Sequence, residues 1–209
     1  MRIQPIVEGH GEVTAVPVLL RRLRDEAGAY GFEINQAIRR HRSDFLTEES
    51  MRTAVRLALV QDQCRAILIL FDGDDDCPGT LAPTVEAWAQ DEAGPVPCAV
   101  VIAHREYEAW FIAAIESLRG RRGILDDAVS HPDPETPRDA KGNLEDRMRP
   151  GLSYAETADQ AALTALFDMS AAYARCRSFR RMVRAFELLV TGIGIELTAW
   201  PPAEWQEGA

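Results

Sequence analysis

The sequence predicts an α/β fold, with a mostly parallel sheet covered by helices on both faces. Over residues 1–118, short apolar runs alternate with segments whose apolar residues recur at helical spacing, which is the pattern of strand–helix repeats. Residues 66–71 are continuously apolar, as expected of a strand buried on both sides of a parallel sheet. Acidic residues follow two of the apolar runs, so these strand ends are candidates for a functional site.

The amino-terminal part is expected to contain two strands and two helices. Residues 2–7 form the first strand, although Pro5 cannot donate a hydrogen bond to a neighbouring strand. Residues 12–26 form a helix whose apolar side is made by Val13, Val16, Leu20 and Leu23. Residues 32–38 form a weak second strand. Thr47 then caps a helix that ends near Gln63.

Two further strands and two helices are expected before residue 118. The strand at residues 66–71 is followed by a turn at Pro78 and Gly79, and then by a helix over residues 81–92. Residues 97–103 form the fourth strand, and residues 104–110 lead into a helix that ends near residue 118. Trp110 and Phe111 in this helix are expected in the core rather than against nucleic-acid bases.

The composition divides the chain into three parts. Residues 1–118 are the α/β core, residues 119–153 are a loop or mobile insertion rich in glycine, proline and charge, and residues 154–209 are a helical extension packed on the core. Within the extension, residues 154–190 are expected to form two helices that meet near residues 176–178. Residues 193–197 are expected to form a short edge strand.

The overall composition argues against several classes of protein. No apolar run approaches the roughly 20 residues that span a bilayer, and the first residues lack the apolar stretch of a signal peptide. We therefore expect a cytoplasmic protein without membrane association. The four cysteines form no C-x-x-C pair, so neither a zinc site nor a redox motif is indicated. The net charge of −10 argues against a wholly basic clamp for nucleic acid.

Two acidic clusters carry the main functional prediction. Glu8 and Glu12 flank Gly9 and Gly11 after the first strand, and these glycines permit a tight turn and close approach to a ligand. Alternate residues of an extended tip point the same way, and three aspartates alternate after residue 71: Asp72, Asp74 and Asp76. Because the carboxyl ends of parallel strands meet at one edge, the two clusters predict a site for Mg²⁺ or Mn²⁺.

Two features of these clusters allow more than one interpretation. His10 is either placed to move a proton or is a polar loop residue without chemistry. The run after residue 71 is either a metal site or a solvated acidic loop. Its position directly after the most buried strand favours the metal site.

The order of these motifs resembles the Toprim domain of topoisomerases, DnaG-type primases and OLD-family nucleases, which has a glutamate after its first strand and a DxD motif after its third. The resemblance covers about residues 1–115. A longer pattern is similar to a family of small uncharacterised Toprim-like proteins of phage-defence neighbourhoods, catalogued as a domain of unknown function. That pattern comprises VEGHGE at residues 7–12, FDGD at 71–74, HREYEAWF at 104–111, YAETADQ at 154–160 and CRSFR at 176–180.

The resemblance implies a role for each acidic residue. Glu8 corresponds to the glutamate assigned to metal binding or acid–base catalysis, and Glu12 to a second glutamate of the nuclease branch. Asp72 and Asp74 correspond to the metal-binding DxD motif. Glu108 corresponds to a later acidic position that completes a second metal site, or it is only a charge at a helix start.

Four further residues complete the candidate site. Asp76 is a candidate metal ligand, and His10, Arg105 and Lys141 are candidate substrate-binding residues. Lys141 is the only lysine of the chain. Its side chain either places a positive charge beside the scissile phosphate or is a solvated loop residue.

Together these roles predict a Mg²⁺- or Mn²⁺-dependent nuclease that cleaves phosphodiester bonds as an effector in phage defence. An ion held by Glu8, Asp72 and Asp74 would polarise the phosphoryl oxygen and lower the pKa of a bound water. The alternative is a non-catalytic or regulated partner subunit of an AAA- or ABC-type ATPase. The sequence leaves the oligomeric state and the choice between DNA and RNA open.

Three other readings of the motifs fit less well. A dehalogenase-type phosphatase needs its DxD motif after the first strand, whereas here it follows the third. A response-regulator receiver needs a lysine after its fifth strand, and no lysine precedes Lys141. A dinucleotide-binding fold needs G-x-G-x-x-G, which residues 9–14 do not complete.

Overall fold

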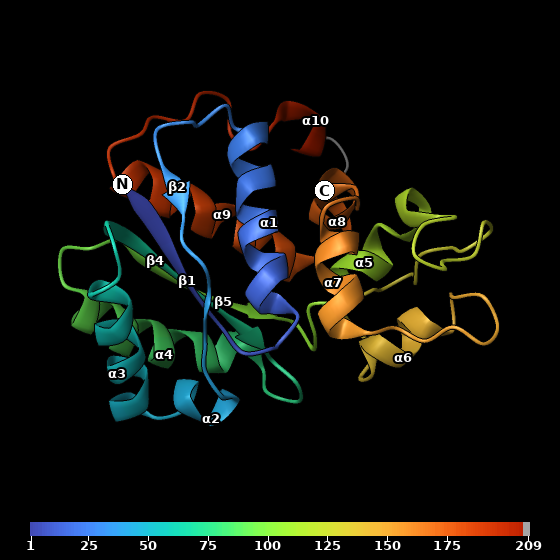
Figure 1. Cartoon of the computed structure of the whole chain (residues 1–209), viewed down its shortest axis with the longest axis horizontal. Helices are drawn as coiled ribbons and strands as arrows, with labels where there is room; N and C mark the ends of the chain where they lie inside the picture. Colours follow the sequence, from blue (N-terminus) through green and yellow to red (C-terminus); the bar gives the residue numbers. More distant parts are fainter. Residues whose placement is uncertain (207–209) are drawn as a thin grey trace.

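A parallel β-sheet forms the centre of the protein in the computed structural model, which describes residues 1–206 (Figure 1). Its strands are β1 (Arg2–Val7), β2 (Glu33–Ile34), β3 (Ile38–Arg39), β4 (Cys64–Asp72) and β5 (Cys98–Ala103). The order across the sheet is β2-β1-β4-β5, and β3 also pairs with β1. Every strand pair is parallel. The predicted α/β class is confirmed.

Helices cover both faces of this sheet. The short helix α2 (Arg42–Phe45), α3 (Glu48–Leu59) and α4 (Pro78–Ala93) lie on one face, and α1 (Glu12–Glu26) and α9 (Arg177–Gly192) lie on the other. Strand β4 serves both sides, because Ile67, Ile69 and Phe71 face α3 and α4, whereas Leu68 and Leu70 face α1 and α9. All five side chains are fully buried, which explains the continuous apolar run.

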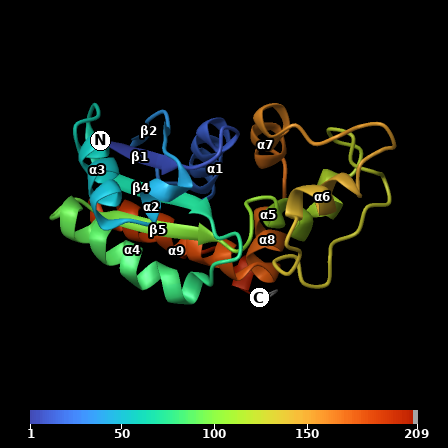
Figure 2. The ribbon, with the colours of Figure 1, turned by 90° about the horizontal axis from the view of Figure 1, so that it is seen from below.

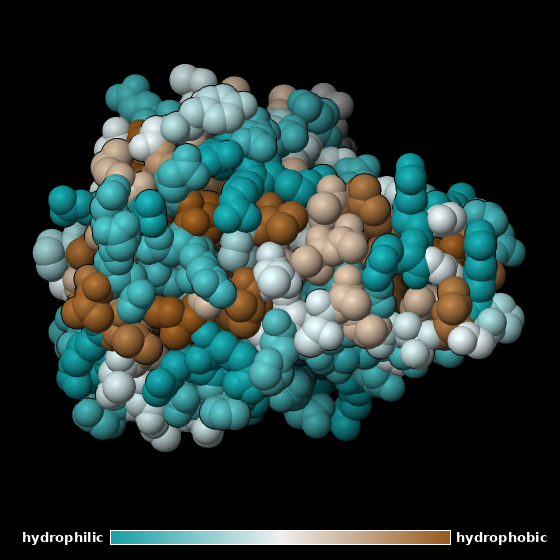
Figure 3. All heavy atoms as spheres, viewed as in Figure 1, coloured by the Kyte–Doolittle hydropathy of each residue, from teal (hydrophilic) through white to brown (hydrophobic). Residues whose placement is uncertain are grey.

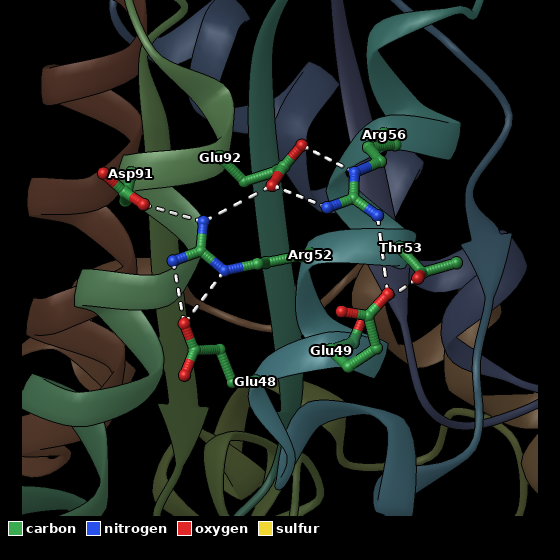
Figure 4. A network of polar contacts seen from close by, with 7 residues as sticks. All are labelled: Glu48, Glu49, Arg52, Thr53, Arg56, Asp91 and Glu92. Carbon is green, nitrogen blue, oxygen red and sulfur yellow. Dashed lines mark hydrogen bonds and ion pairs between the residues drawn. The ribbon is translucent and has the colours of Figure 1, made fainter.

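A surface network of ion pairs joins α3 to α4 (Figure 4). The Arg52 guanidinium lies 2.7 Å from Asp91 and 2.8 Å from Glu48, and Arg56 lies 2.7 Å from Glu92. Glu92 also pairs with Arg52. Exposed ion pairs contribute little to stability one by one, but a connected set fixes the relative position of two helices.

The remaining helices lie beside the carboxyl edge of the sheet. They are α5 (Ala109–Ala113), a 3₁₀ turn (Ile115–Leu118), α6 (Ala140–Glu145), α7 (Glu156–Thr164), α8 (Met169–Arg175) and α10 (Ala203–Gln206). Trp110 and Phe111 lie in the core, as predicted, and pack edge-on against Phe179 and Phe167 respectively. The Trp110 indole also donates a hydrogen bond of 2.8 Å to the Ser178 hydroxyl, so α5 and α9 form one packed unit.

Residues 119–153 extend from the sheet on the right of Figures 1 and 2. This segment contains α6, which the sequence did not predict, and it buries Ile124, Ala140 and Leu144. Ile124 and Met148 form an isolated antiparallel bridge. The division of the chain into three parts remains a prediction.

Several predicted boundaries were wrong for local reasons. Pro78 and Gly79 do not form a turn but begin α4, where the first position of a helix accepts proline because its amide needs no partner. The weak second strand is two short strands, β2 and β3. Residues 154–190 contain three helices rather than two, although the break near Cys176 was correct. Residues 193–197 form no strand.

The surface of the described part is mainly hydrophilic. The face in Figure 3 shows hydrophobic residues in separated groups rather than as one continuous area. The exposed large apolar residues belong to different elements and loops, for example Tyr30, Val60 and Val129. Within residues 1–206, none of the helices has both the length and the apolar character required to cross a bilayer.

Candidate functional site

The two acidic clusters meet at the carboxyl edge of the sheet, between β1 and β4. After β1 the chain crosses to β2 and β3 on one side, whereas β4 and β5 lie on the other side. The order of strands therefore reverses between β1 and β4, and such a point opens a crevice where α/β proteins bind ligands. Glu8 follows β1, and Asp72 ends β4.

The loop between β1 and α1 is held by Glu12. Its Oε2 atom accepts hydrogen bonds from the backbone N–H groups of Glu8 (3.0 Å) and Gly9 (2.9 Å). The loop also touches α7, because a Cβ atom on Gly11 would lie 2.3 Å from Gln160 Oε1 and 2.6 Å from the Glu156 carbonyl oxygen. Glycine at this position therefore lets the acidic loop approach α7.

Asp72 links the ends of three chain segments. Its backbone N–H donates to Glu8 Oε2 at 3.3 Å, and its Oδ1 atom accepts a hydrogen bond of 2.9 Å from the Tyr107 amide. The loop after β5 thus fixes the Asp72 carboxylate, while Asp72 itself fixes the Glu8 side chain. Both carboxylates are only partly buried.

Glu108 is fully buried beside this pair, at the start of α5. Its Oε1 atom accepts hydrogen bonds from the Tyr154 hydroxyl (2.8 Å) and from Gln160 Nε2 (3.3 Å). Its Oε2 atom has no hydrogen-bond partner among the described residues, and neither has the buried Oε1 atom of Gln160. Unsatisfied buried oxygens are rare in proteins and call for a donor or a cation.

The carboxyl groups of this cluster hold their protons unusually well. Burial and the charge of Glu108 raise the pKa of Glu12 to about 8. Burial and the charge of Glu106 raise the pKa of Glu108 to about 7. Burial and the charges of Glu12 and Glu108 raise the pKa of Asp72 well above its usual range. Like charges forced together in a buried site produce this effect, and a bound cation would relieve it.

Lys141 supplies a positive charge at the edge of the cluster. Burial lowers the pKa of its ammonium group, but the carboxylates of Glu108, Glu156 and Asp72 outweigh this effect and raise the pKa overall. Its Nζ atom lies 3.4 Å from Glu156 Oε2, and its backbone N–H donates to Glu106. Lys141 therefore belongs to the site through α6, although 33 residues separate it from Glu108 in sequence.

Arg42, which the sequence did not single out, holds the other two aspartates. Its guanidinium lies 3.2 Å from Asp74, 2.6 Å from Asp76 and 4.0 Å from Glu8. It also donates to the backbone carbonyls of Asp72 and Gly73. Arg42 thus neutralises the exposed side of the aspartate loop.

The expectation of an extended tip after β4 was wrong. Asp74 has φ +47°, and the Asp76 amide donates back to the Gly73 carbonyl at 2.9 Å, so the chain turns at this point. The turn directs Asp74 and Asp76 to Arg42, while Asp72 is held by the Tyr107 amide. The residue between them, Asp75, pairs with Arg105 at 2.8 Å.

A cleft of about 250 Å³ opens onto the cluster. Glu8, Asp72, His10 and Lys141 line it, together with Arg39, His41, Arg42 and Glu156. His10 is exposed. Arg105 does not line this cleft. Of the predicted residues, the structure brings together Glu8, Glu12, Asp72, Glu108 and Lys141, and it places Asp74 and Asp76 around Arg42.

The chemistry of the cluster fits a hard divalent cation, because its donors are carboxylate oxygens and one of them is buried without a partner. As the side chains stand within residues 1–206, however, no three Asp, Glu, His or Cys residues are arranged to hold a metal ion. Binding would require a change of side-chain conformation at the cluster.

Sequence reasoning missed the residues that surround the acids. Tyr154 and Gln160 contact Glu108, and Glu156 contacts Lys141. Their signal was present, since all three lie in the motif at residues 154–160. Arg42 carries no distinguishing signal in the sequence, and only its tertiary contacts with the residues after β4 set it apart from the neighbouring arginines.

Comparison with known proteins identifies one family. The model of a domain of unknown function, DUF4276, matches residues 7–187. Neither the curated proteins nor the solved structures contain a match. The matched residues include both acidic clusters, Glu108, Lys141 and the helices that complete the site. The chain therefore belongs to the DUF4276 family.

Proposed function

We propose that this protein is a metal-dependent phosphodiester hydrolase, in which Glu8, Glu12, Asp72 and Glu108 hold Mg²⁺ or Mn²⁺. The observation that carries the proposal is the crowding of these four carboxyl groups at the point where the strand order reverses. Burial raises the pKa of each, and a neighbouring carboxylate adds to the rise: Asp74 for Glu8, Glu108 for Glu12, Glu12 for Asp72 and Glu106 for Glu108. Crowding buried carboxyl groups costs folding free energy, and groups with such perturbed pKa values are typical of functional sites.

The surrounding residues hold two of the proposed ligands in place. Backbone amides fix Glu12, and the Tyr107 amide fixes Asp72, so two ligands keep their orientation before any ion binds. A bound ion would supply polarisation of the phosphoryl oxygen and a water of lowered pKa. Asp74 and Asp76, which pair with Arg42, would serve as additional ligands for the ion.

The rim of the cleft suits a phosphate group. Lys141 presents an ammonium group beside the carboxylates, and Arg39 lines the same cleft with its buried Nε atom unpaired among the described residues. Cationic groups of this kind bind and orient phosphate oxygens. The substrate in this proposal is nucleic acid, with the scissile phosphate between Lys141 and Asp72.

The likeness to Toprim domains supports the same chemistry. The glutamate follows β1, and the DxD motif begins at the end of β4, which is the fourth strand in sequence but only the second long one, because β2 and β3 have two residues each. On this basis we propose a role as a nuclease effector in phage defence, with an AAA- or ABC-type ATPase as a candidate partner.

A non-catalytic partner subunit is the second candidate function. The observation that favours it is Arg42, whose guanidinium pairs with Asp74 and Asp76 and approaches Glu8. An internal cation that compensates these acids makes a metal unnecessary for folding. In that case the acidic cluster is a structural feature of a protein that acts by binding.

A cleavage assay tests the hydrolase proposal. Supercoiled plasmid, single-stranded DNA and total tRNA are incubated with the protein and Mn²⁺ or Mg²⁺, with EDTA as the blank. We expect cleavage of at least one substrate, reduced about a hundredfold or more in Glu8→Ala and Asp72→Asn. Glu49→Gln, on the exposed side of α3, should match the wild type. If no substrate is cut under any condition, the hydrolase proposal fails.

A further inference from the structure

Gln160 presents an unpaired oxygen to the acidic site. It is buried on α7, with a relative exposure of 1%. Its Nε2 atom donates a hydrogen bond of 3.3 Å to Glu108 Oε1, whereas its Oε1 atom has no partner among the described residues. A buried amide oxygen without a donor costs free energy, so this atom calls for a partner that the side chains around it do not supply.

The contact with Glu108 fixes the orientation of this amide. In the opposite orientation Gln160 Oε1 would face Glu108 Oε1, and a carboxylate oxygen and an amide oxygen can only accept hydrogen bonds. The side-chain nitrogen therefore lies on the Glu108 side, and the oxygen lies against the loop between β1 and α1. A Cβ atom on Gly11 of that loop would collide with Gln160 Oε1. Glycine at this position thus lets the amide oxygen reach the loop that leads into Glu12.

Two carboxyl groups beside this amide also have free oxygens. Glu108 Oε2 is buried without a partner in the described part of the chain. The backbone amides of Glu8 and Gly9 both bind Glu12 Oε2, which leaves Glu12 Oε1 without a hydrogen bond within residues 1–206. Glu12 and Glu108 lie close enough for the charge of one to act on the other. Three oxygens, carried by α1, α7 and the start of α5, therefore lie in one neighbourhood without hydrogen-bond donors.

The donors near these oxygens are already engaged. The Tyr154 hydroxyl donates to Glu108 Oε1 at 2.8 Å, and the Lys141 ammonium group lies 3.4 Å from Glu156 Oε2. Among the described residues, neither group donates to Glu108 Oε2 or to Gln160 Oε1. A divalent cation can satisfy several oxygens at once, and the side-chain carbonyls of asparagine and glutamine are among its usual ligands.

We propose that Gln160 is a further ligand of the divalent cation, which it binds through Oε1 beside Glu12 and Glu108. This rests on the metal site of the proposed function and adds α7 to that site. A bound ion would join α1, α7 and the start of α5 through one centre. Cation binding should therefore hold α7 against the acidic loop.

Calorimetric titration with Mn²⁺ at pH 8 tests Gln160 as a ligand. Gln160→Met keeps the length of the side chain but removes both its oxygen and its N–H group, and we expect about tenfold weaker binding. Gln160→Glu keeps an oxygen at this place but also loses the N–H group, and we expect binding at least as tight as in the wild type. Gln90→Met, which changes an exposed glutamine of α4, should match the wild type.

The two Gln160 variants separate a ligand from a residue that only positions Glu108. If Gln160 acted only through its N–H group, both variants would lose binding equally, and that result overturns the proposal. Unchanged binding in Gln160→Met also overturns it, and the proposed function then stands if Asp72→Asn still loses binding. Absence of Mn²⁺ binding by the wild type refutes both the ligand role and the proposed function.

Amide hydrogen exchange of the wild type provides a readout that does not depend on variants. The amides of residues 160–164 form the helical hydrogen bonds of α7, and Mg²⁺ should slow their exchange relative to EDTA. Exchange in α3, on the other face of the sheet, should change little. Protection of the loop between β1 and α1 without any change in α7 would show that the ion does not engage Gln160, and this result overturns the proposal.

Discussion

The Tyr154 hydroxyl donates a hydrogen bond of 2.8 Å to Glu108 Oε1, across 46 residues of sequence. This bond connects the segment before α7 with the start of α5, and it satisfies only one of the two carboxylate oxygens. The other oxygen is buried without a partner in the described part of the chain. The carboxy-terminal helices therefore complete the acidic site rather than simply cover the sheet.

Replacement of Glu108 by glutamine separates the charge of this side chain from its shape. The pKa of Glu108 is about 7, so at pH 8 the carboxylate is largely charged although it is buried. We expect Glu108→Gln to stabilise the metal-free protein by about 1 kcal/mol at pH 8, and to weaken Mn²⁺ binding by about tenfold. Urea unfolding in EDTA and calorimetric titration measure the two effects.

Glu116 provides a matched control, because Ser130 and Arg175 hydrogen-bond to its carboxylate and lower its pKa. Glu116→Gln should destabilise the protein slightly and leave Mn²⁺ binding unchanged. Identical behaviour of the two variants would show that the Glu108 carboxylate has no special role.

The stability of the metal-free protein should fall as pH rises. Glu12 has a pKa of about 8 in the folded protein against an ordinary value of 4.5, so its proton favours the folded state. This contribution is fully present below pH 4.5 and is lost as pH rises through about 8. Between pH 6 and pH 9 we expect a loss on the order of 2 kcal/mol in EDTA. Denaturant unfolding at several pH values measures it, and Glu12→Gln should flatten the profile. A stability that rises over this range contradicts the assignment.

Removal of the Arg42 charge should strengthen metal binding. The guanidinium lies 4.0 Å from Glu8 and pairs with Asp74 and Asp76, so it repels a divalent cation that approaches these groups. We expect Arg42→Gln to raise Mn²⁺ affinity about fivefold, and to lower the melting temperature in EDTA. Arg105→Gln is the control, because Arg105 pairs with Asp75 instead. Weaker Mn²⁺ binding in Arg42→Gln would mean that the arginine organises the site.

A methyl group at Gly11 should disrupt the contact between the acidic loop and α7. The new Cβ atom would lie 2.6 Å from the Glu156 carbonyl oxygen, and a backbone atom cannot move away cheaply. We expect Gly11→Ala to cost about 2 kcal/mol of unfolding free energy. Gly79→Ala is the control, since the nearest atom would be 3.8 Å away, and in the first turn of α4 it should stabilise by about 0.5 kcal/mol. Equal effects on thermal unfolding would exclude the close contact.

The sequence predicted the fold best where each element follows a simple period. Helix α1 and strand β1 have the predicted boundaries, because their apolar residues repeat regularly and glycines mark the loop between them. It failed at α6 and at residues 193–197, where short segments take their conformation from contacts with distant residues. Ala140 and Leu144, for example, are buried by tertiary packing and not by any local pattern.

The candidate site was predictable in its acids but not in its polar surroundings. Parallel strand ends bring Glu8 and Asp72 together by topology alone. The contacts of Arg42 with Asp74 and Asp76 depend on a turn at Asp74 with positive φ, which non-glycine residues rarely adopt. No sequence period encodes such a turn, so the partners of these aspartates could only be seen in the structure.

Calorimetric titration of the protein with Mn²⁺ at pH 8 tests the central claim most directly. We expect saturable binding by the wild type, loss of that binding in Asp72→Asn, and wild-type binding in Asp91→Asn, which changes an exposed residue of α4. Absence of binding by the wild type, or identical titrations of wild type and Asp72→Asn, would contradict it.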